Sequence, residues 1–150
     1  MVLPPDIFHQ IVTDKLFLIP LCAVVLASIL KMGIIALVHR EFSLQTLLSY
    51  GGMPSAHAAT VSSITTAILF DQGASPLFFV AFFMSVITIR DAFGVRWQSG
   101  QQAKLLNKIN AVFDIEDDVT LKEILGHTKT QTFFGVLLGI AVASIGYVYF

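Results

Sequence analysis

Four apolar runs separated by short polar segments predict how this chain folds. They cover residues 16–38, 55–70, 76–97 and 128–150. A helix needs about 20 apolar residues to cross the hydrocarbon core of a membrane, and three of the runs reach that length. The run 55–70 is short for a full crossing, so this helix must borrow length from the segment before it or be partly buried in protein. The pattern predicts an all-α integral membrane bundle of about four spanning helices in a single domain, residues 1–150.

The polar segments complete this picture. Residues 98–127 are polar at helical spacing and predict a surface segment, with a short helix over Thr120 to Leu125. Residues 1–14 are predicted to lie at the membrane interface, before the first spanning helix. In an alternative topology one short helix is re-entrant, which would move one terminus to the other side of the membrane.

Composition excludes several classes of protein. Hydrophobic residues make up 55% of the chain and charged residues 13%, which is too apolar for an ordinary soluble domain. A net charge of -1 argues against nucleic acid as the main partner. The one cysteine, Cys22, lies inside an apolar run and has no intrachain partner for a disulfide.

The basic residues indicate the orientation in the membrane. Of the nine lysines and arginines, only Lys15 falls on one side of the four-helix arrangement. The other eight are Lys31, Arg40, Arg90, Arg96, Lys104, Lys108, Lys122 and Lys129. Since loops rich in Lys and Arg stay in the cytoplasm, we expect the loops 39–54 and 98–127 to lie there, in a protein of the cell (inner) membrane. This brings Gly51–His57, Arg90–Trp97 and Gly126–His127 to one membrane face.

The segment Gly51–His57 has the composition of a helix start that binds an anion. It reads Gly-Gly-Met-Pro-Ser-Ala-His and lies between two apolar runs. With Ser55 as the N-cap, the unpaired amides of the first turn and the positive end of the helix dipole would face a ligand beside His57. Phosphate groups bind well at such helix starts.

A second histidine, His127, precedes another predicted helix on the same face. Covalent removal of a phosphate needs a neutral imidazole that attacks phosphorus, a protonated group for the leaving oxygen, and donors for the other oxygens. Two histidines in different environments can divide the first two roles. The expected phosphate-binding residues are Lys31, Ser55, Arg96, Arg90 and Gly52. This chemistry requires neither a metal nor a cofactor.

Each of these features also has a structural explanation. Lys31 can extend toward the headgroups from near the end of its helix, and Arg90 with Asp91 can anchor a helix end. A lone histidine near the interface is more often a hydrogen-bonded tether than a catalyst. An acidic cluster could hold a divalent cation, although a solvated turn is favoured. It consists of Asp114, Glu116, Asp117 and Asp118.

Small residues recur along the last apolar run. Gly135, Gly139 and Ala143 fall four apart, which predicts a face for close helix packing. The same face could join copies of the chain into a homo-oligomer. Thr128 and Gln131 form a predicted capping box at the start of this helix.

Three motifs together resemble a known family. They are GGMPSAH at residues 51–57, DAFGVR at 91–96 with GQQA at 100–103 and Leu106-Asn107, and LKEILGHT at 121–128. In this order, over roughly residues 31–139, the chain resembles the divergent branch of the type 2 phosphatidic acid phosphatase superfamily. The resemblance implies a helical membrane enzyme that hydrolyses a lipid phosphate through a phosphohistidine, without metal. It makes His57 the general acid and His127 the nucleophile.

The chain departs from the superfamily pattern near the nucleophile. Leu121 stands where an arginine is usual and Gln131 where a carboxylate is usual, while Trp97 replaces a second arginine of the divergent branch. Arg96 is our candidate for the missing arginine. A lipid-phosphate phosphatase is the favoured reading. The alternatives are a weakly active or inactive lipid-phosphate-binding scaffold, which the departures favour, and an assembly subunit of the membrane.

Overall fold

The protein is an all-α bundle, as the apolar runs predict. The computed structural model describes residues 6–39, 52–113, 120–123 and 125–149, and no strand occurs among them. The described helices are α1 (Ile7–Thr13), α2 (Lys15–His39), α4 (Ala56–Gln72), α5 (Pro76–Phe93), α6 (Val95–Phe113) and α7 (Lys129–Tyr149). Helices long and apolar enough to span a membrane fall within Lys15–Val38, Pro76–Phe113 and Lys129–Tyr149.

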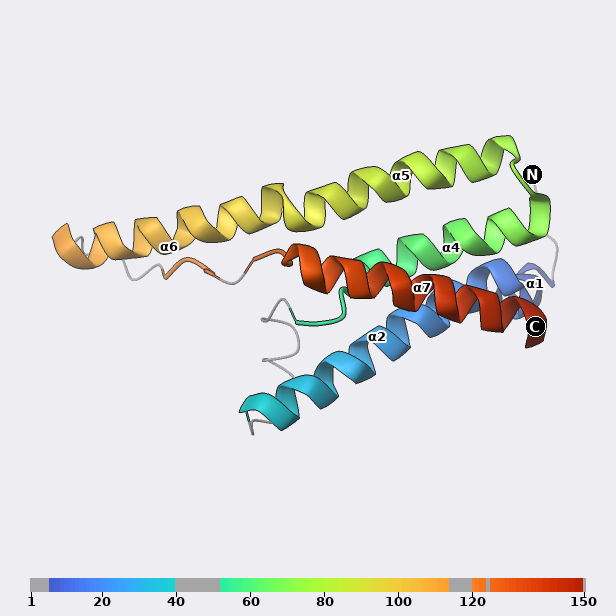
Figure 1. Ribbon diagram of the computed structural model, residues 1–150, viewed down its shortest axis with the longest axis horizontal. Helices are drawn as coiled ribbons and strands as arrows, with labels where there is room; N and C mark the ends of the chain where they lie inside the picture. Colours follow the sequence, from blue (N-terminus) through green and yellow to red (C-terminus); the bar gives the residue numbers. More distant parts are fainter. Residues whose placement is uncertain (1–5, 40–51, 114–119, 124, 150) are drawn as a thin grey trace.

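The short helix α4 is the centre of the bundle. It contacts α2, α5 and α7 and runs between α5 and α7 in Figure 1. At 17 residues it is shorter than the three candidate spans, and half-buried or buried residues fill most of its length. This agrees with the expectation that the 55–70 helix is partly buried in protein.

Small residues let α7 lie directly against α4. A Cβ atom added at Gly135 would overlap Ser55, and one added at Gly139 would overlap Ser62 and Ala59. Ala143 is fully buried further along the same face. The predicted small-residue face therefore packs within the chain, against α4. Formation of a homo-oligomer stays a prediction, and this face is already occupied.

Hydroxyl groups add bonds between the helices. Thr65 and Ser85 lie 2.7 Å apart, Oγ1 to Oγ, and join α4 to α5. Ser85 Oγ also donates to the Val61 carbonyl at 3.0 Å, and Ser62 Oγ donates to the Val136 carbonyl on α7 at 3.3 Å. In a membrane such bonds satisfy polar side chains and align neighbouring helices.

The third apolar run ends earlier than expected. α5 stops at Phe93 and is capped at Gly94, instead of continuing to Trp97. α6 then follows nearly the same direction and extends beyond the ends of α4 and α7 (Figure 1). Residues 98–113 thus belong to a helix that extends out of the bundle. This is expected for a polar segment that lies outside the apolar runs.

The expected helix over Thr120 to Leu125 is wrong. The described residues 120–123 and 125 are not helical and lie along α6. The Asn107 side chain takes both backbone groups of Leu121: Nδ2 donates to its carbonyl at 2.9 Å, and Oδ1 accepts from its amide at 3.0 Å. Asn107 Nδ2 also donates to Glu123 Oε1 at 3.0 Å. These hydrogen bonds to α6 take the place of the backbone hydrogen bonds that a helix over these residues would make.

An ion pair lies at the end of the bundle far from the histidines. At the end where α4 finishes and α7 finishes, Lys15 forms an ion pair with Asp71 at 2.8 Å and lies 4.1 Å from the centre of the Tyr147 ring. The motifs that contain the two histidines lie at the opposite end (Figure 1). The one basic residue expected on the far side is therefore neutralised there by an acidic partner.

Candidate functional site at the starts of two helices

His57 lies at the beginning of α4. Ser55 is the N-cap of this helix, as predicted, and its hydroxyl accepts a hydrogen bond from the Ala58 amide at 3.4 Å. Ser55 is fully buried. Its hydroxyl is committed to the cap, so Ser55 sets the helix start that directs His57 outward, where the side chain is exposed.

His127 is held by its backbone against the junction of α5 and α6. Its amide donates to the Ala92 carbonyl at 2.8 Å, at the end of α5. The preceding residue, Gly126, has φ +79° and abuts the backbone of Trp97. A side chain at Gly126 would collide with that backbone, and its positive φ is strained for any other residue. The imidazole of His127 is consequently placed by main-chain contacts.

The structure brings the two histidines together. Their ring centroids lie 6.1 Å apart with an angle of 60° between the ring planes. The Ser55 amide donates to the Gln131 carbonyl at 3.0 Å, which ties the first turn of α7 to the start of α4. Residues seventy positions apart in the sequence (127 − 57 = 70) thus share one site.

Lys31 reaches the same site from α2. A Cβ added at Gly52 would lie 2.8 Å from Lys31 Cγ, so the aliphatic part of the lysine crosses the Gly52 backbone. Burial lowers the pKa of both His57 and His127, and the positive charge of Lys31 lowers each pKa further. Lys31 and Gly52, two of the expected phosphate-binding residues, are therefore next to the histidines.

The two arginines differ in their surroundings. Arg96 Nε donates to Asp91 Oδ2 at 2.7 Å. The charge of Arg96 lowers the pKa of His57, which burial already lowers, whereas the charge of Asp91 raises it. The Arg96 side chain is 57% exposed, so its guanidinium group can approach a ligand from solvent. Arg90 is also exposed, at the end of α5, where its carbonyl accepts from Gly94. The contacts described for Arg90 do not link it to either histidine.

His127 has one ring nitrogen with an open hydrogen-bonding position. Its Nδ1 is buried and has no hydrogen-bond partner among the described residues. Burial lowers the pKa of His127, and the charges of His57 and Lys31 lower it further, while the nearby Gln131 side chain and Gly52 backbone oppose these effects. The neutral imidazole is thus favoured, which is the form that can act as a nucleophile.

Gln131 is occupied elsewhere. Its Oε1 accepts from the Thr128 amide at 3.0 Å, and its own amide donates to Thr128 Oγ1 at 3.2 Å. The predicted capping box is confirmed. The residue in the position of the superfamily's carboxylate therefore stabilises the start of α7, and no described residue accepts a hydrogen bond from His127 Nδ1.

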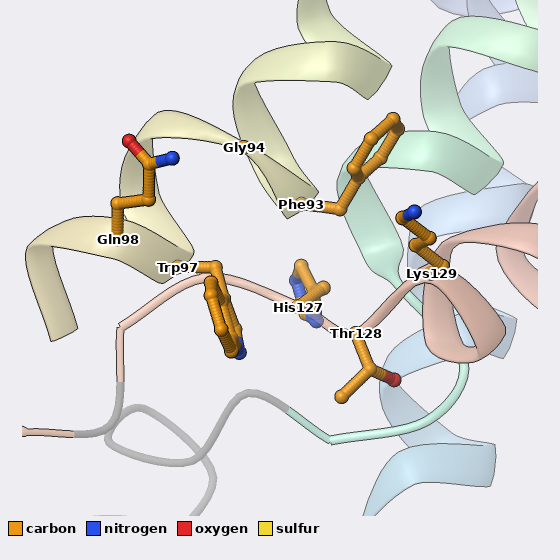
Figure 2. Close-up of a pocket in the computed structure, with 7 residues that line it drawn as sticks. All are labelled: Phe93, Gly94, Trp97, Gln98, His127, Thr128 and Lys129. Atoms are coloured by element: carbon orange, nitrogen blue, oxygen red, sulfur yellow. The ribbon is translucent and has the colours of Figure 1, made fainter. Parts of the chain in front are cut away.

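A cavity of about 510 Å³ opens beside His127. Figure 2 shows His127 at its centre, with Trp97 on one side and Thr128 and Lys129 on the other. Phe93, Gly94 and Gln98 complete the wall. The histidine is accordingly accessible from the junction of α5 and α6.

Sequence reasoning did not find the partners of two residues that shape the site. Asp91 was interpreted as an interfacial anchor or part of a local ion pair, and its partner is Arg96, five positions later, across the break at Gly94. Asn107 belongs to a motif that carried the resemblance, although its function as a clamp for residues 121–123 has no local signal. Leu121 therefore lies in the segment that Asn107 holds against α6, outside the helix bundle. The acidic cluster lies outside the described residues, among which no group of metal-ligating side chains occurs.

Comparisons with known proteins identify the family. The model of the divergent PAP2 family matches residues 12–142. An uncharacterized membrane protein of Bacillus subtilis, YuiD, is 34% identical over 151 aligned positions, which cover 91% of this chain and 96% of the relative. No solved structure matches. The match covers most of the chain and includes all three motifs, so the protein belongs to the divergent PAP2 family.

Proposed function

We propose that this membrane protein hydrolyses a phosphate monoester or diphosphate on a lipid, through a phosphohistidine formed on His127. The observation that carries the proposal is the pair of imidazoles whose centroids lie 6.1 Å apart at the starts of α4 and α7. Family membership supports a relationship to lipid phosphatases, and the three candidate spans support a substrate that lies in the membrane.

The proposed reaction has two steps. A neutral ring nitrogen of His127 attacks phosphorus, and a P–N bond forms while the P–O bond to the leaving group breaks, which is the lipid alcohol for a monoester and the lipid monophosphate for a diphosphate. His57 gives its proton to the departing oxygen. Water then attacks the phosphohistidine, transfers a proton to His57 and releases inorganic phosphate, which restores both histidines. Phosphate oxygens would be held by Lys31, Arg96 and the amides near Gly52.

A specific observation also favours the second candidate, a lipid-phosphate-binding protein with little turnover. His127 Nδ1 has no described acceptor, and Gln131 is engaged in the capping box. Without an anionic acceptor to stabilise the imidazolium, a histidine loses much of its catalytic power. We place the site on the cytoplasmic face because basic residues concentrate at that end.

Phosphate release by the purified protein in detergent distinguishes these functions. We expect wild-type protein to release phosphate from a phosphatidic acid, and both His57→Ala and His127→Ala to abolish release. His9→Ala is the matched control, because His9 is exposed on α1 at the other end of the bundle. Release that survives in His127→Ala would exclude the phosphohistidine. Binding without release in wild type would support the scaffold, and loss of release after chelation would indicate a metal.

A further inference from the structure

An apolar groove lies between α2 and α7, and the Met53–Pro54 segment lines one end of it. The groove has a volume of about 380 Å³. Leu30 and Ile34 form its α2 side, and Phe134, Leu137 and Ala141 form its α7 side. None of its described lining residues is charged, and its walls belong to two of the candidate membrane spans.

This groove begins where the proposed phosphate site ends. Met53 and Pro54 immediately precede the Ser55 cap, and Lys31, which crosses Gly52, follows Leu30 on α2. On the other wall, Phe134 lies between Gln131, which is bonded to Ser55, and Gly139, which packs on α4. A phosphate beside Lys31 and His57 would therefore lie next to the end of the groove that Met53 and Pro54 line.

We infer that this groove holds one hydrocarbon chain of the lipid whose phosphate lies between the two histidines. The inference rests on the proposed function and specifies how the substrate's apolar part is bound. From Phe134 to Ala141 the groove follows α7 for about 10 Å, at 1.5 Å per residue, away from the histidines. Its walls stay open on one side: Leu30 is 42% and Leu137 46% exposed. A chain can therefore enter from the bilayer without leaving the hydrocarbon.

Two photoreactive lipids test this. The first is a long-chain, non-hydrolysable phosphonate with a photoreactive group on its chain, and the second is the corresponding neutral alcohol. In wild-type protein we expect the phosphonate to label peptides that contain Leu137 and Ala141 at least about tenfold more than the alcohol does, because the headgroup site holds it in register. Equal labelling by both probes would identify an ordinary lipid contact and overturn the inference, as would absence of labelling there.

A pair of variants checks the location. Ala141→Trp should fill the groove and reduce phosphonate labelling of α7 to the alcohol's level. Ile87→Trp adds the same bulk on α5, where the side chain is 62% exposed and lines neither this groove nor the cavity beside His127, and should leave labelling unchanged. Labelling that persists in Ala141→Trp would contradict the assignment. Because the probe is not hydrolysed, specific labelling combined with absence of phosphate release from phosphatidic acid would refute turnover and retain the groove.

Discussion

The Ser55 amide donates a hydrogen bond to the Gln131 carbonyl at 3.0 Å. This single bond joins the helix starts that carry His57 and His127. It forms because Gly135, one turn further along α7, lets the backbone of Ser55 come close. The geometry of the histidine pair thus depends on a glycine that belongs to neither helix start.

Gly139→Leu should separate α4 from α7. The added side chain has to displace Ser62 and the backbone of Ala59, and overpacking of this kind costs roughly 1–3 kcal/mol of the free energy of unfolding. Thermal unfolding in detergent measures the loss. Gly33→Ala is the matched control, because nothing lies within 4 Å of its added methyl group. An unchanged unfolding temperature in Gly139→Leu would contradict the packing.

Local sequence signals were sufficient for the long apolar helices and for the starts of α4 and α7. Apolar runs of about 20 residues predict spans regardless of their partners, and the Ser55 cap and the Thr128 capping box involve residues three positions apart. The meeting of His57 and His127 was predicted only as a shared membrane face, through the distribution of basic residues. The distance between the rings required the structure.

Contacts between distant segments escaped prediction for a physical reason. The helix expected over Thr120 to Leu125 was assigned on local composition, but the backbone of Leu121 is bonded to Asn107, fourteen residues earlier. Likewise, the side chain of Asp91 meets Arg96 only because α5 ends at Gly94 and α6 starts again. Neither spacing follows the helical repeat of three or four residues.

Arg96→Ala should weaken the binding of phosphate by about tenfold or more, since an arginine fork provides charge-assisted bonds to phosphate oxygens. The measurement is competition of inorganic phosphate with lipid hydrolysis. Lys108→Ala serves as the control, because it removes one positive charge from the exposed part of α6. If both variants bind phosphate equally well, Arg96 is not part of the site.

Gln131→Glu should raise the rate of hydrolysis, by about tenfold or more. A carboxylate can still cap the Thr128 amide and also offers an anionic acceptor to His127, which stabilises the imidazolium formed during turnover. Gln131→Ala is the companion variant: it removes the cap, costs about 1 kcal/mol of stability and gains no rate. A rate for Gln131→Glu at or below that of the wild type would show that the unpartnered Nδ1 does not limit turnover.

The dependence of hydrolysis on pH reports the state of His127. Because burial and the neighbouring positive charges lower its pKa, this proposed nucleophile stays neutral below the usual histidine value of about 6.5. As pH falls, kcat/KM should therefore decline only after the pH has passed below that value. Gln131→Glu adds a negative charge, raises the pKa of His127 and should move the acidic decline to higher pH. A decline that begins above pH 6.5 in wild type and stays there in Gln131→Glu would assign it to another group.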